Sequence, residues 1–238
     1  MERRLIRAAA LSFLLCAFLS IPSLGQEGEW SFILKGNYTT SAEIFPNPTA
    51  SDPVVRAQFH AVEDFFGFGA EVSYRFPESL IALGVSADHI RASLSRSLQV
   101  ASRRPVSVED GYDVIPVEIT GYFIIPASGP RFGLFIGGGG GIYFGRRVYS
   151  VAGVSAPVVD TRPGLGIHVL AGGSFRFLEH FSVIGEMKFR DLQFESTNQF
   201  SASRIEYNGA VINVGDKPFD SRVQTDGVLF QLGVAFHF

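Results

Sequence analysis

Alternation at every second position is the feature that most limits how this chain of 238 residues can fold. The last segment shows it most clearly, because every second residue from Val228 to Phe238 is apolar, while Gln231 and His237 lie between them. A period of two is the period of a β-strand, whose successive side chains point to opposite faces. The chain is therefore expected to be built from strands.

Seven earlier segments have the same period, and each is about long enough to cross a bilayer at a tilt. The eight expected strands lie at about 29–38, 66–76, 81–88, 115–123, 132–144, 165–177, 181–190 and 227–238. Because a bilayer does not tolerate an open sheet edge, we expect the first strand to pair with the last. The predicted fold is all-β: an eight-stranded antiparallel up-and-down transmembrane β-barrel.

The connections between these strands alternate between short and long. Short ones are expected at 77–79, 126–130 and 178–180, and long ones at about 39–65, 95–112, 146–163 and 195–226. Membrane barrels alternate in this way, with short periplasmic turns and long extracellular loops. We therefore expect residues 26–238 to form one barrel in the cell outer membrane, with extracellular loops and periplasmic termini.

Aromatic residues are concentrated near the ends of the expected strands, on the apolar face. Membrane barrels carry aromatic girdles at the two interfaces, whereas a soluble barrel or sandwich would place more of these rings in the middle of its strands. The residues expected in the girdles are Trp30, Tyr38, Phe66, Tyr74, Phe76, Phe132, Phe144, Phe177 and Phe181.

The first 25 residues have the composition of a cleavable signal peptide. A basic start is followed by an apolar run from Ala8 to Ile21, and Ser23 and Gly25 supply the small residues before a cleavage site after Gly25. Cys16 is the only cysteine and would leave with this segment, so disulfide and thiolate chemistry are not expected. The remaining chain is slightly acidic, which excludes a strongly basic nucleic-acid binder.

Taken together, the signal-peptide pattern, the eight alternating strands, the alternating connections and the ending Gly233–Phe238 resemble the small OmpA/OmpX-type outer-membrane barrels. The resemblance covers residues 26–238. It implies that Phe236 and Phe238 form a C-terminal insertion signal, which the barrel-assembly machinery would read. OmpA itself continues into a peptidoglycan-binding domain, which we do not expect here, so anchoring to the cell wall does not carry over.

Charged residues on the expected inner face predict an interior polar network. The interior of an eight-stranded barrel is only wide enough for side chains to fill, so charges there must be paired. The members expected in this network are Lys35, Glu71, Glu118, Glu186, Lys188 and Arg190. We interpret the network as a salt-bridged plug, and the alternative is a narrow ion path. Charges that simply reach water at the barrel mouths are also possible, and Arg75, Arg176 and Arg190 fit that alternative.

The expected loops offer two features that could serve recognition. Asn208-Gly209 predicts a β-hairpin at about 203–214, because this dipeptide suits a tight turn between β-prone residues. Four arginines near the strand ends are possible lipopolysaccharide contacts, since a guanidinium can bind phosphate with two hydrogen bonds. They are Arg103, Arg104, Arg146 and Arg147, and the alternative role is solubility with salt bridges inside the loops.

Catalytic and cofactor sites are not expected. The run Gly137–Gly141 lacks the Lys-Ser/Thr ending of a phosphate-binding loop and lies inside a strand. The only local catalytic candidates, Asp88, His89 and Ser93, do not form a relay, because Asp88 and His89 have opposite parity. The histidines also lack spaced partners for a metal.

The function expected from these features is a non-enzymatic integral outer-membrane barrel. It would contribute to envelope integrity and present surface loops for binding or adhesion, with outer-membrane lipids and an extracellular ligand as partners. A narrow porin-like channel is the first alternative. A lipid-modifying outer-membrane enzyme is the second.

Overall fold

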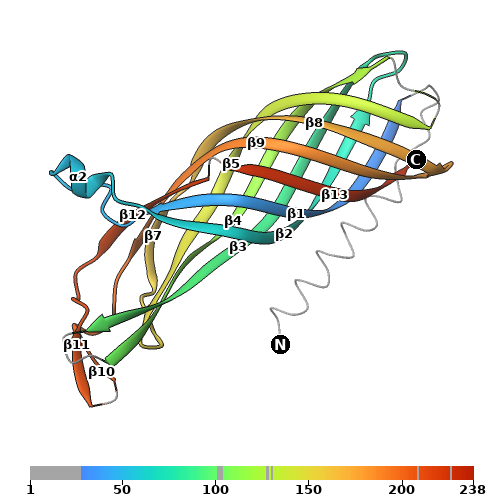
Figure 1. The fold of residues 1–238 in the computed structure, drawn as a ribbon. Helices are drawn as coiled ribbons and strands as arrows, with labels where there is room; N and C mark the ends of the chain where they lie inside the picture. Colours follow the sequence, from blue (N-terminus) through green and yellow to red (C-terminus); the bar gives the residue numbers. More distant parts are fainter. Residues whose placement is uncertain (1–27, 101–103, 127–128, 130, 208, 226) are drawn as a thin grey trace, which may run out of the picture.

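The computed structural model describes residues 28–100, 104–126, 129, 131–207, 209–225 and 227–238, and Figure 1 draws it as a ribbon. The signal peptide expected at 1–25 lies outside these residues. The elements are β1 (Glu29–Phe45), α2 (Pro53–Arg56), β2 (His60–Arg75), β3 (Ile81–Val100), β4 (Arg104–Ile125), β5 (Phe132–Val151), β6 (Val154–Ser155), β7 (Val158–Arg162), β8 (Gly164–Leu178), β9 (Phe181–Asn198), β10 (Arg204–Tyr207), β11 (Ala210–Asn213), β12 (Phe219–Thr225) and β13 (Val228–His237). Within the described ranges, no helix has the length and apolar character needed to cross a membrane.

Eight strand positions close into a ring. The ring runs β1, β2, β3, β4, β5, β8, β9 and β13, and neighbouring strands are antiparallel. β13 pairs back onto β1, with Phe236 opposite Phe32 and Phe230 opposite Tyr38. The predicted closure and the predicted eight-stranded antiparallel barrel are therefore confirmed.

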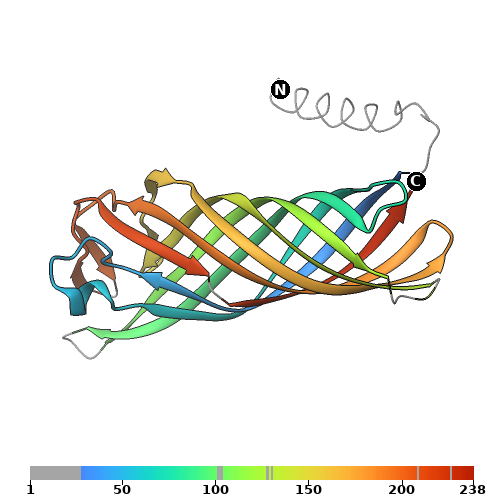
Figure 2. The ribbon, with the colours of Figure 1, turned by 90° about the horizontal axis from the view of Figure 1, so that it is seen from above.

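The barrel is longer than it is wide, and its two ends differ (Figures 1 and 2). At one end, which we call the turn end, the connections 76–80, 126–131 and 179–180 are short, and β1 begins beside the end of β13. At the other end, the loop end, the segments 46–59 and 199–227 carry α2 and the small hairpin of β10 and β11.

The strands continue well beyond their predicted bounds toward the loop end, so the predicted loop ranges are too wide. The expected loop 95–112 is almost entirely strand, because β3 runs to Val100 and β4 begins at Arg104. The ranges 39–65, 146–163 and 195–226 lose residues at their edges to β1, β2, β5 and β9 in the same way. β12 also lies inside the last range, where it pairs with both β9 and β1 beyond the start of β13. The predicted loop ranges are too wide because the apolar face of the strands changes from the outside to the inside of the barrel along their length.

Near the turn end the outer face of the barrel is apolar, as predicted. Seven apolar side chains spread over seven strands of the ring are between 37% and 67% exposed, so they face outward and not into a dry core. They are Phe68, Leu83, Val117, Leu134, Val169, Val183 and Leu232. An exposed apolar belt around a closed barrel is the surface that membrane barrels present to lipid. The chain therefore has a membrane-spanning band.

Toward the loop end the two faces exchange character. Along β9 the outward residues change from Val183, Met187 and Phe189 to Asp191, Gln193 and Glu195. The inward residues change in the opposite sense, from Glu186, Lys188 and Arg190 to Leu192 and Phe194. A polar outside over an apolar inside is the pattern of a barrel surrounded by water. The membrane-spanning band therefore ends near Phe189. The sequence predicts a loop for the extension beyond it, because the outer residues of the extension are polar.

Aromatic rings lie on the outer face at both edges of the band. At the turn end, Trp30 lies 4.8 Å from Tyr74, and Phe181 lies 5.2 Å from Phe236 between ring centroids. At the other edge, Tyr38 lies 5.2 Å from Phe66. Rings in these places form the interfacial girdles of membrane barrels.

Candidate functional site

The lumen contains the charged residues that the sequence places on the inner face. Nearest the turn end, Lys35 Nζ lies 2.6 Å from Glu71 Oε2 and 2.8 Å from Glu186 Oε2. All three side chains are buried, and Tyr122 donates a hydrogen bond to Glu71 Oε1 at 2.7 Å. Lys35 comes from β1, Glu71 from β2 and Glu186 from β9, so one ammonium group links three strands.

A second set of charges lies further toward the loop end and centres on Glu118. Its carboxylate is 2.9 Å from Lys188 Nζ and 2.7 Å from Arg190 Nε, and it accepts a hydrogen bond from Tyr143 at 2.9 Å. Arg190 also lies 2.8 Å from Asp88 Oδ2. β4 and β9 are not neighbours in the sheet, so the pairs of Glu118 with Lys188 and Arg190 cross the lumen.

These two sets together form what we call the ionic layer: Lys35, Glu71, Asp88, Glu118, Glu186, Lys188 and Arg190. The six residues that the sequence assigns to an interior network are all in it. Arg190 is buried by its partners, so the alternative that it reaches water at a barrel mouth is wrong. Asp88 is a further member of the layer that the sequence does not predict. In the sequence, only its inward parity marks Asp88 as a member. Its contact with Arg190 depends on the register between the strands, which parity does not give.

Inner-face glycines make room for the aromatic residues of the lumen. A Cβ added to Gly145 on β5 would lie 2.5 Å from ring atoms of Phe194, and one on Gly166 of β8 would lie 2.6 Å from the ring of Tyr143. Gly137–Gly141 lie within β5 and pair with β4 and β8, as the structural interpretation of that run requires. The inner-face glycines are therefore packing positions in the barrel wall.

An apolar layer fills the lumen next to the ionic layer, on its loop side. Its rings pack against one another, with Tyr112 lying 5.5 Å from Phe65 and 6.2 Å from Phe194 between centroids. The buried members are Ala42, Ile44, Val62, Phe65, Ile90, Ala92, Tyr112, Val114, Tyr143, Leu192, Phe194 and Val223. The apolar layer and the ionic layer together occupy the middle of the barrel.

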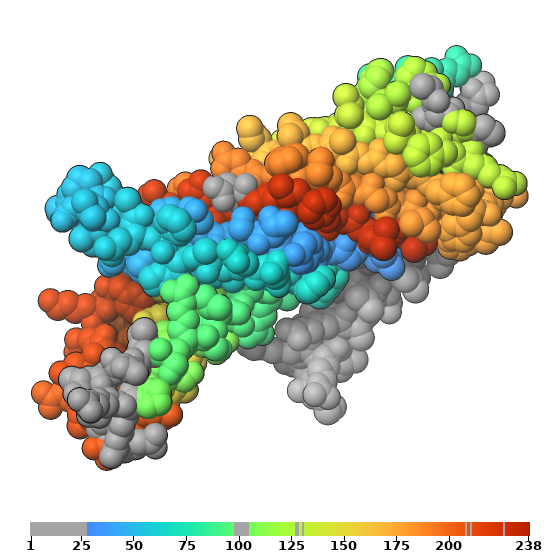
Figure 3. Space-filling view, viewed as in Figure 1, coloured from blue at the N-terminus to red at the C-terminus, as the bar shows by residue number. Residues whose placement is uncertain are grey.

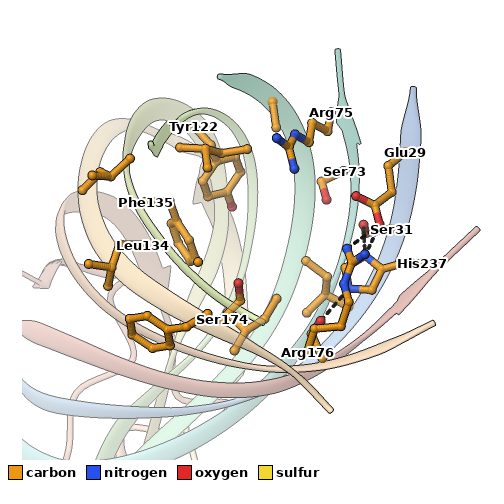
Figure 4. A pocket seen from close by; sticks show the side chains of 18 of the residues that line it. Glu29, Ser31, Ser73, Arg75, Tyr122, Leu134, Phe135, Ser174, Arg176 and His237 are labelled. Atoms are coloured by element: carbon orange, nitrogen blue, oxygen red, sulfur yellow. Dashed lines mark hydrogen bonds and ion pairs between the residues drawn. The ribbon is translucent and has the colours of Figure 1, made fainter. Parts of the chain in front are cut away.

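Two cavities lie on opposite sides of these layers. The turn-end cavity has a volume of about 520 Å³, and the Lys35 side of the ionic layer forms its floor through Glu71 and Glu186. Figure 4 looks into this cavity, with Glu29, Ser31, His237 and Arg176 grouped on one side and Tyr122, Phe135 and Leu134 on the other. The loop-end cavity has a volume of about 640 Å³, and residues of β4, β5 and the 199–227 segment line it.

The loop-end cavity is mainly apolar. Its lining includes Val106, Val108, Val151, Phe200, Ile212 and Phe219. The predicted hairpin borders it: β10 and β11 pair, with Tyr207 opposite Ala210, and Ile205 packs with Phe200 in a small core. Gly209 has the positive φ of 75° that the turn requires, and Asn208 lies outside the described residues. In Figure 3 this hairpin and the segment with α2 project from the loop end as separate lobes.

The four arginines predicted to contact lipopolysaccharide do not form one surface. Arg147 is 3% exposed, points into the barrel and binds Asp110 with two hydrogen bonds of 2.6 and 2.7 Å. Its assignment as a surface contact is wrong, because adjacent residues of a strand face opposite sides and Arg146 takes the outer face. Arg103 lies outside the described residues, as does the side chain of Arg104. Beside Arg147, burial raises the pKa of Tyr149 above its ordinary value.

Arg146 belongs to a row of outward-facing side chains at the loop edge of the apolar band. Its guanidinium lies 2.8 Å from one carboxylate oxygen of Asp113, and His89 Nε2 lies 3.0 Å from the other. His89 therefore has a carboxylate partner, but the partner is Asp113 on the neighbouring strand and not Asp88, which faces the lumen. Among the described residues, no group of three histidine, cysteine or acidic side chains could hold a metal ion.

The C-terminal aromatics lie on the outer face at the turn end. Phe236 and Phe238 stack with 5.7 Å between their centroids, and both are exposed. Between them, His237 points inward, with Ser31 and Ser182 each 2.8 Å from one of its ring nitrogens.

Similar architecture occurs in solved outer-membrane proteins. The outer membrane protein OprG from Pseudomonas aeruginosa matches with a TM-score of 0.56 at 12% identity, covering 90% of this chain and 97% of that one. AlkL, solved in lipid bilayers, matches with a TM-score of 0.52 at 11% identity, covering 90% of this chain and 91% of AlkL. Neisserial surface protein A matches with a TM-score of 0.51 at 11% identity, covering 89% and 100%.

This is the fold of the small outer-membrane β-barrels. Together with the exposed apolar band, it places the chain in the outer membrane. The sequence matches no protein-family model and no curated protein. At identities of 11–12% the likeness extends to the fold alone.

Proposed function

We propose that this protein is a closed, non-enzymatic outer-membrane barrel that stabilises the envelope and binds partners at its loop end. The observation that carries the proposal is the filled lumen. Three cations and four carboxylates of the ionic layer pair across the barrel, and the apolar layer packs directly beside them. Buried charges with partners on several strands tie the wall together, and they leave no wide aqueous path through the middle.

The loop end supports the binding part of this proposal. The loop end lies beyond the membrane-spanning band. The strands remain paired there, since β12 pairs with both β1 and β9, so the segments of the loop end are held by a rigid wall. The loop-end cavity falls within the size range of small-molecule sites, which are mostly apolar with a few polar groups. Arg147, Asp216 and Lys217 supply polar groups at this cavity. We propose that the loop end faces the outside and the termini face the periplasm.

The narrow channel is the alternative that the closed lumen argues against, and solute permeation separates the two. The full chain would be refolded into liposomes loaded with an impermeant polymer and then placed in isotonic solutions of small sugars and amino acids. A closed barrel causes no more swelling than empty liposomes, whereas a channel gives swelling that rises as the solute becomes smaller. Swelling above that of empty liposomes would overturn the closed barrel.

The enzymatic alternative depends on the pair of His89 and Asp113. Both lie on the outer face, and Ser93 lies four residues from His89 along the same strand, which is too far for a nucleophile to share its proton with this histidine. Expression of the protein in a Gram-negative host should leave the mass of lipid A unchanged. A new lipid A species that disappears with His89→Ala would favour the lipid-modifying enzyme instead.

A further inference from the structure

The turn-end cavity is distinct from the loop end in both its place and its chemistry. Three arginines lie at its mouth: Arg75 at the end of β2, Arg131 just before β5, and Arg176 near the end of β8. They come from three separate parts of the barrel wall, and each has the parity of the inward face. Three basic side chains therefore line this end of the cavity.

Every acidic side chain that lines this cavity already has a basic partner. Glu71 and Glu186 share Lys35, and Glu29 lies 2.5 Å from Arg176. Within the described residues, Arg75 and Arg131 have no ion pair. The other two acidic residues of the short turns, Glu78 and Glu179, do not line the cavity. The mouth therefore carries three guanidinium groups and one carboxylate, a local excess of two positive charges, whereas the floor carries two carboxylates that share the Lys35 ammonium group.

Below the mouth the cavity becomes apolar on one side. Figure 4 shows Phe135 and Tyr122 opposite the polar group of Ser31 and His237. Phe135 packs against the buried Ile33 and Ile184, and its ring lies 5.7 Å from that of Tyr122. The cavity thus combines a basic mouth, an aromatic wall and a closed floor, in a volume that suits a small ligand.

We infer that the turn-end cavity binds a small amphiphilic anion, with a carboxylate or phosphate group at the mouth and an apolar part against Phe135 and Tyr122. Arginine binds both kinds of head group with paired, charge-assisted hydrogen bonds, which are stronger than those between neutral groups. The ionic layer stops the ligand at the floor, so the cavity is a binding pocket open only at the turn end. This site is independent of the function proposed for the loop end.

Binding can be measured by fluorine NMR on the full chain refolded into phosphatidylcholine nanodiscs, with empty nanodiscs as the blank. The probe is 3-(4-fluorophenyl)propanoate, and the comparison compounds are its amide and 3-(4-fluorophenyl)propylamine, which share its shape and lack its negative charge. The expected result is saturable binding of the acid, at least tenfold tighter than that of the amide or the amine. Fluorobenzyl phosphate, tested in parallel, tells which anionic head group the mouth prefers.

The variant Arg75→Ala/Arg131→Ala should weaken binding of the acid at least tenfold. Both side chains are exposed at the rim, so we expect the barrel to fold, as its mobility shift on unheated gels would verify. The matched control Arg91→Ala/Arg96→Ala removes two exposed arginines that do not line the cavity, and it should bind like the wild type. Equal binding of the acid and the amide, or wild-type affinity in the first variant, would overturn the inference.

Discussion

Lys188 on β9 and Glu118 on β4 meet across the lumen, with 2.9 Å between Lys188 Nζ and Glu118 Oε2. Both side chains are fully enclosed, and Arg190 shares the same carboxylate. The contact joins strands that are not sheet neighbours, so it braces the barrel from within. A charge held in this way is costly to leave without its partner.

Glu118→Gln should therefore destabilise the barrel strongly. The change leaves Lys188 without its only carboxylate partner among the described residues, and Arg190 keeps only Asp88. Breaking a buried pair in this manner costs about 3–5 kcal/mol. Urea unfolding followed by the fluorescence of Trp30, the only tryptophan, would measure it.

The matched control for this prediction is Glu195→Gln. Glu195 lies on the same strand as Lys188, but its pairs with Arg162 and Arg222 are partly exposed and lie at 3.5 and 3.2 Å. Such pairs contribute about 0–1 kcal/mol. Similar losses in both variants would mean that water reaches Glu118 and that the ionic layer is not dry.

The reversal of faces along β9 can be tested by placing one arginine at two depths. Leu232→Arg adds a charge to the lipid-facing band at the height of Gly185, midway between Phe181 and Phe189, and it should cost about 2–4 kcal/mol. Gln193→Arg adds the same charge to the outer face of the neighbouring strand β9, eight residues beyond Gly185, in the polar extension. It should change the free energy of unfolding little. Equal costs would contradict the boundary placed near Phe189.

Gly145→Ala should also destabilise the fold, because its new methyl group would lie 2.5 Å from the Phe194 ring inside the apolar layer. Overpacking of this kind costs about 1–3 kcal/mol. Gly185→Ala is the control, since a Cβ there meets no atom within 4 Å. Urea unfolding of the two variants should separate them, and a stable Gly145→Ala barrel would show that the apolar layer has room to adjust.

The hairpin of β10 and β11 should protect its backbone amides from exchange. Its strands form four antiparallel residue pairs, alternate ones of which are hydrogen-bonded, and Ile205 is buried in a small core with Phe200. Hydrogen–deuterium exchange of the refolded protein should show slow exchange at alternate amides of 204–207 and 211–213, relative to the exposed segment 46–52. Exchange as fast as in a Gly/Ser linker would contradict a folded hairpin.

Much of the barrel could be predicted because a strand in a bilayer has only two environments, lipid and lumen. Alternation alone identified the lipid face from Phe68 to Leu232 and the inward parity of Lys35, Glu71 and Glu186. It failed where the environments changed. Ala92 and Arg91 still alternate beyond the membrane, but there the apolar residue faces the lumen and the charged residue faces outward. Because the outer residues are polar, the sequence predicts a loop in this part of the chain.

Which side chains pair with one another was harder to predict than which side chains face the lumen. Parity places Asp88 inside and His89 outside, but it does not say that Asp88 meets Arg190 or that His89 meets Asp113. Those partners depend on the register between strands and on the reach of long side chains across the barrel. Parity could, however, have excluded Arg147 from the surface, because Arg146 and Arg147 are adjacent in one strand.

Single-channel recording in planar bilayers tests most directly whether the lumen is closed. The refolded full chain would be inserted into a bilayer, with a general porin in the same lipid as the positive control for insertion and detection. The paired charges of the ionic layer and the packed rings of the apolar layer predict a current that stays at the level of the bare bilayer. Regular, ohmic current steps from the wild-type protein would contradict this result and establish an open path through the barrel.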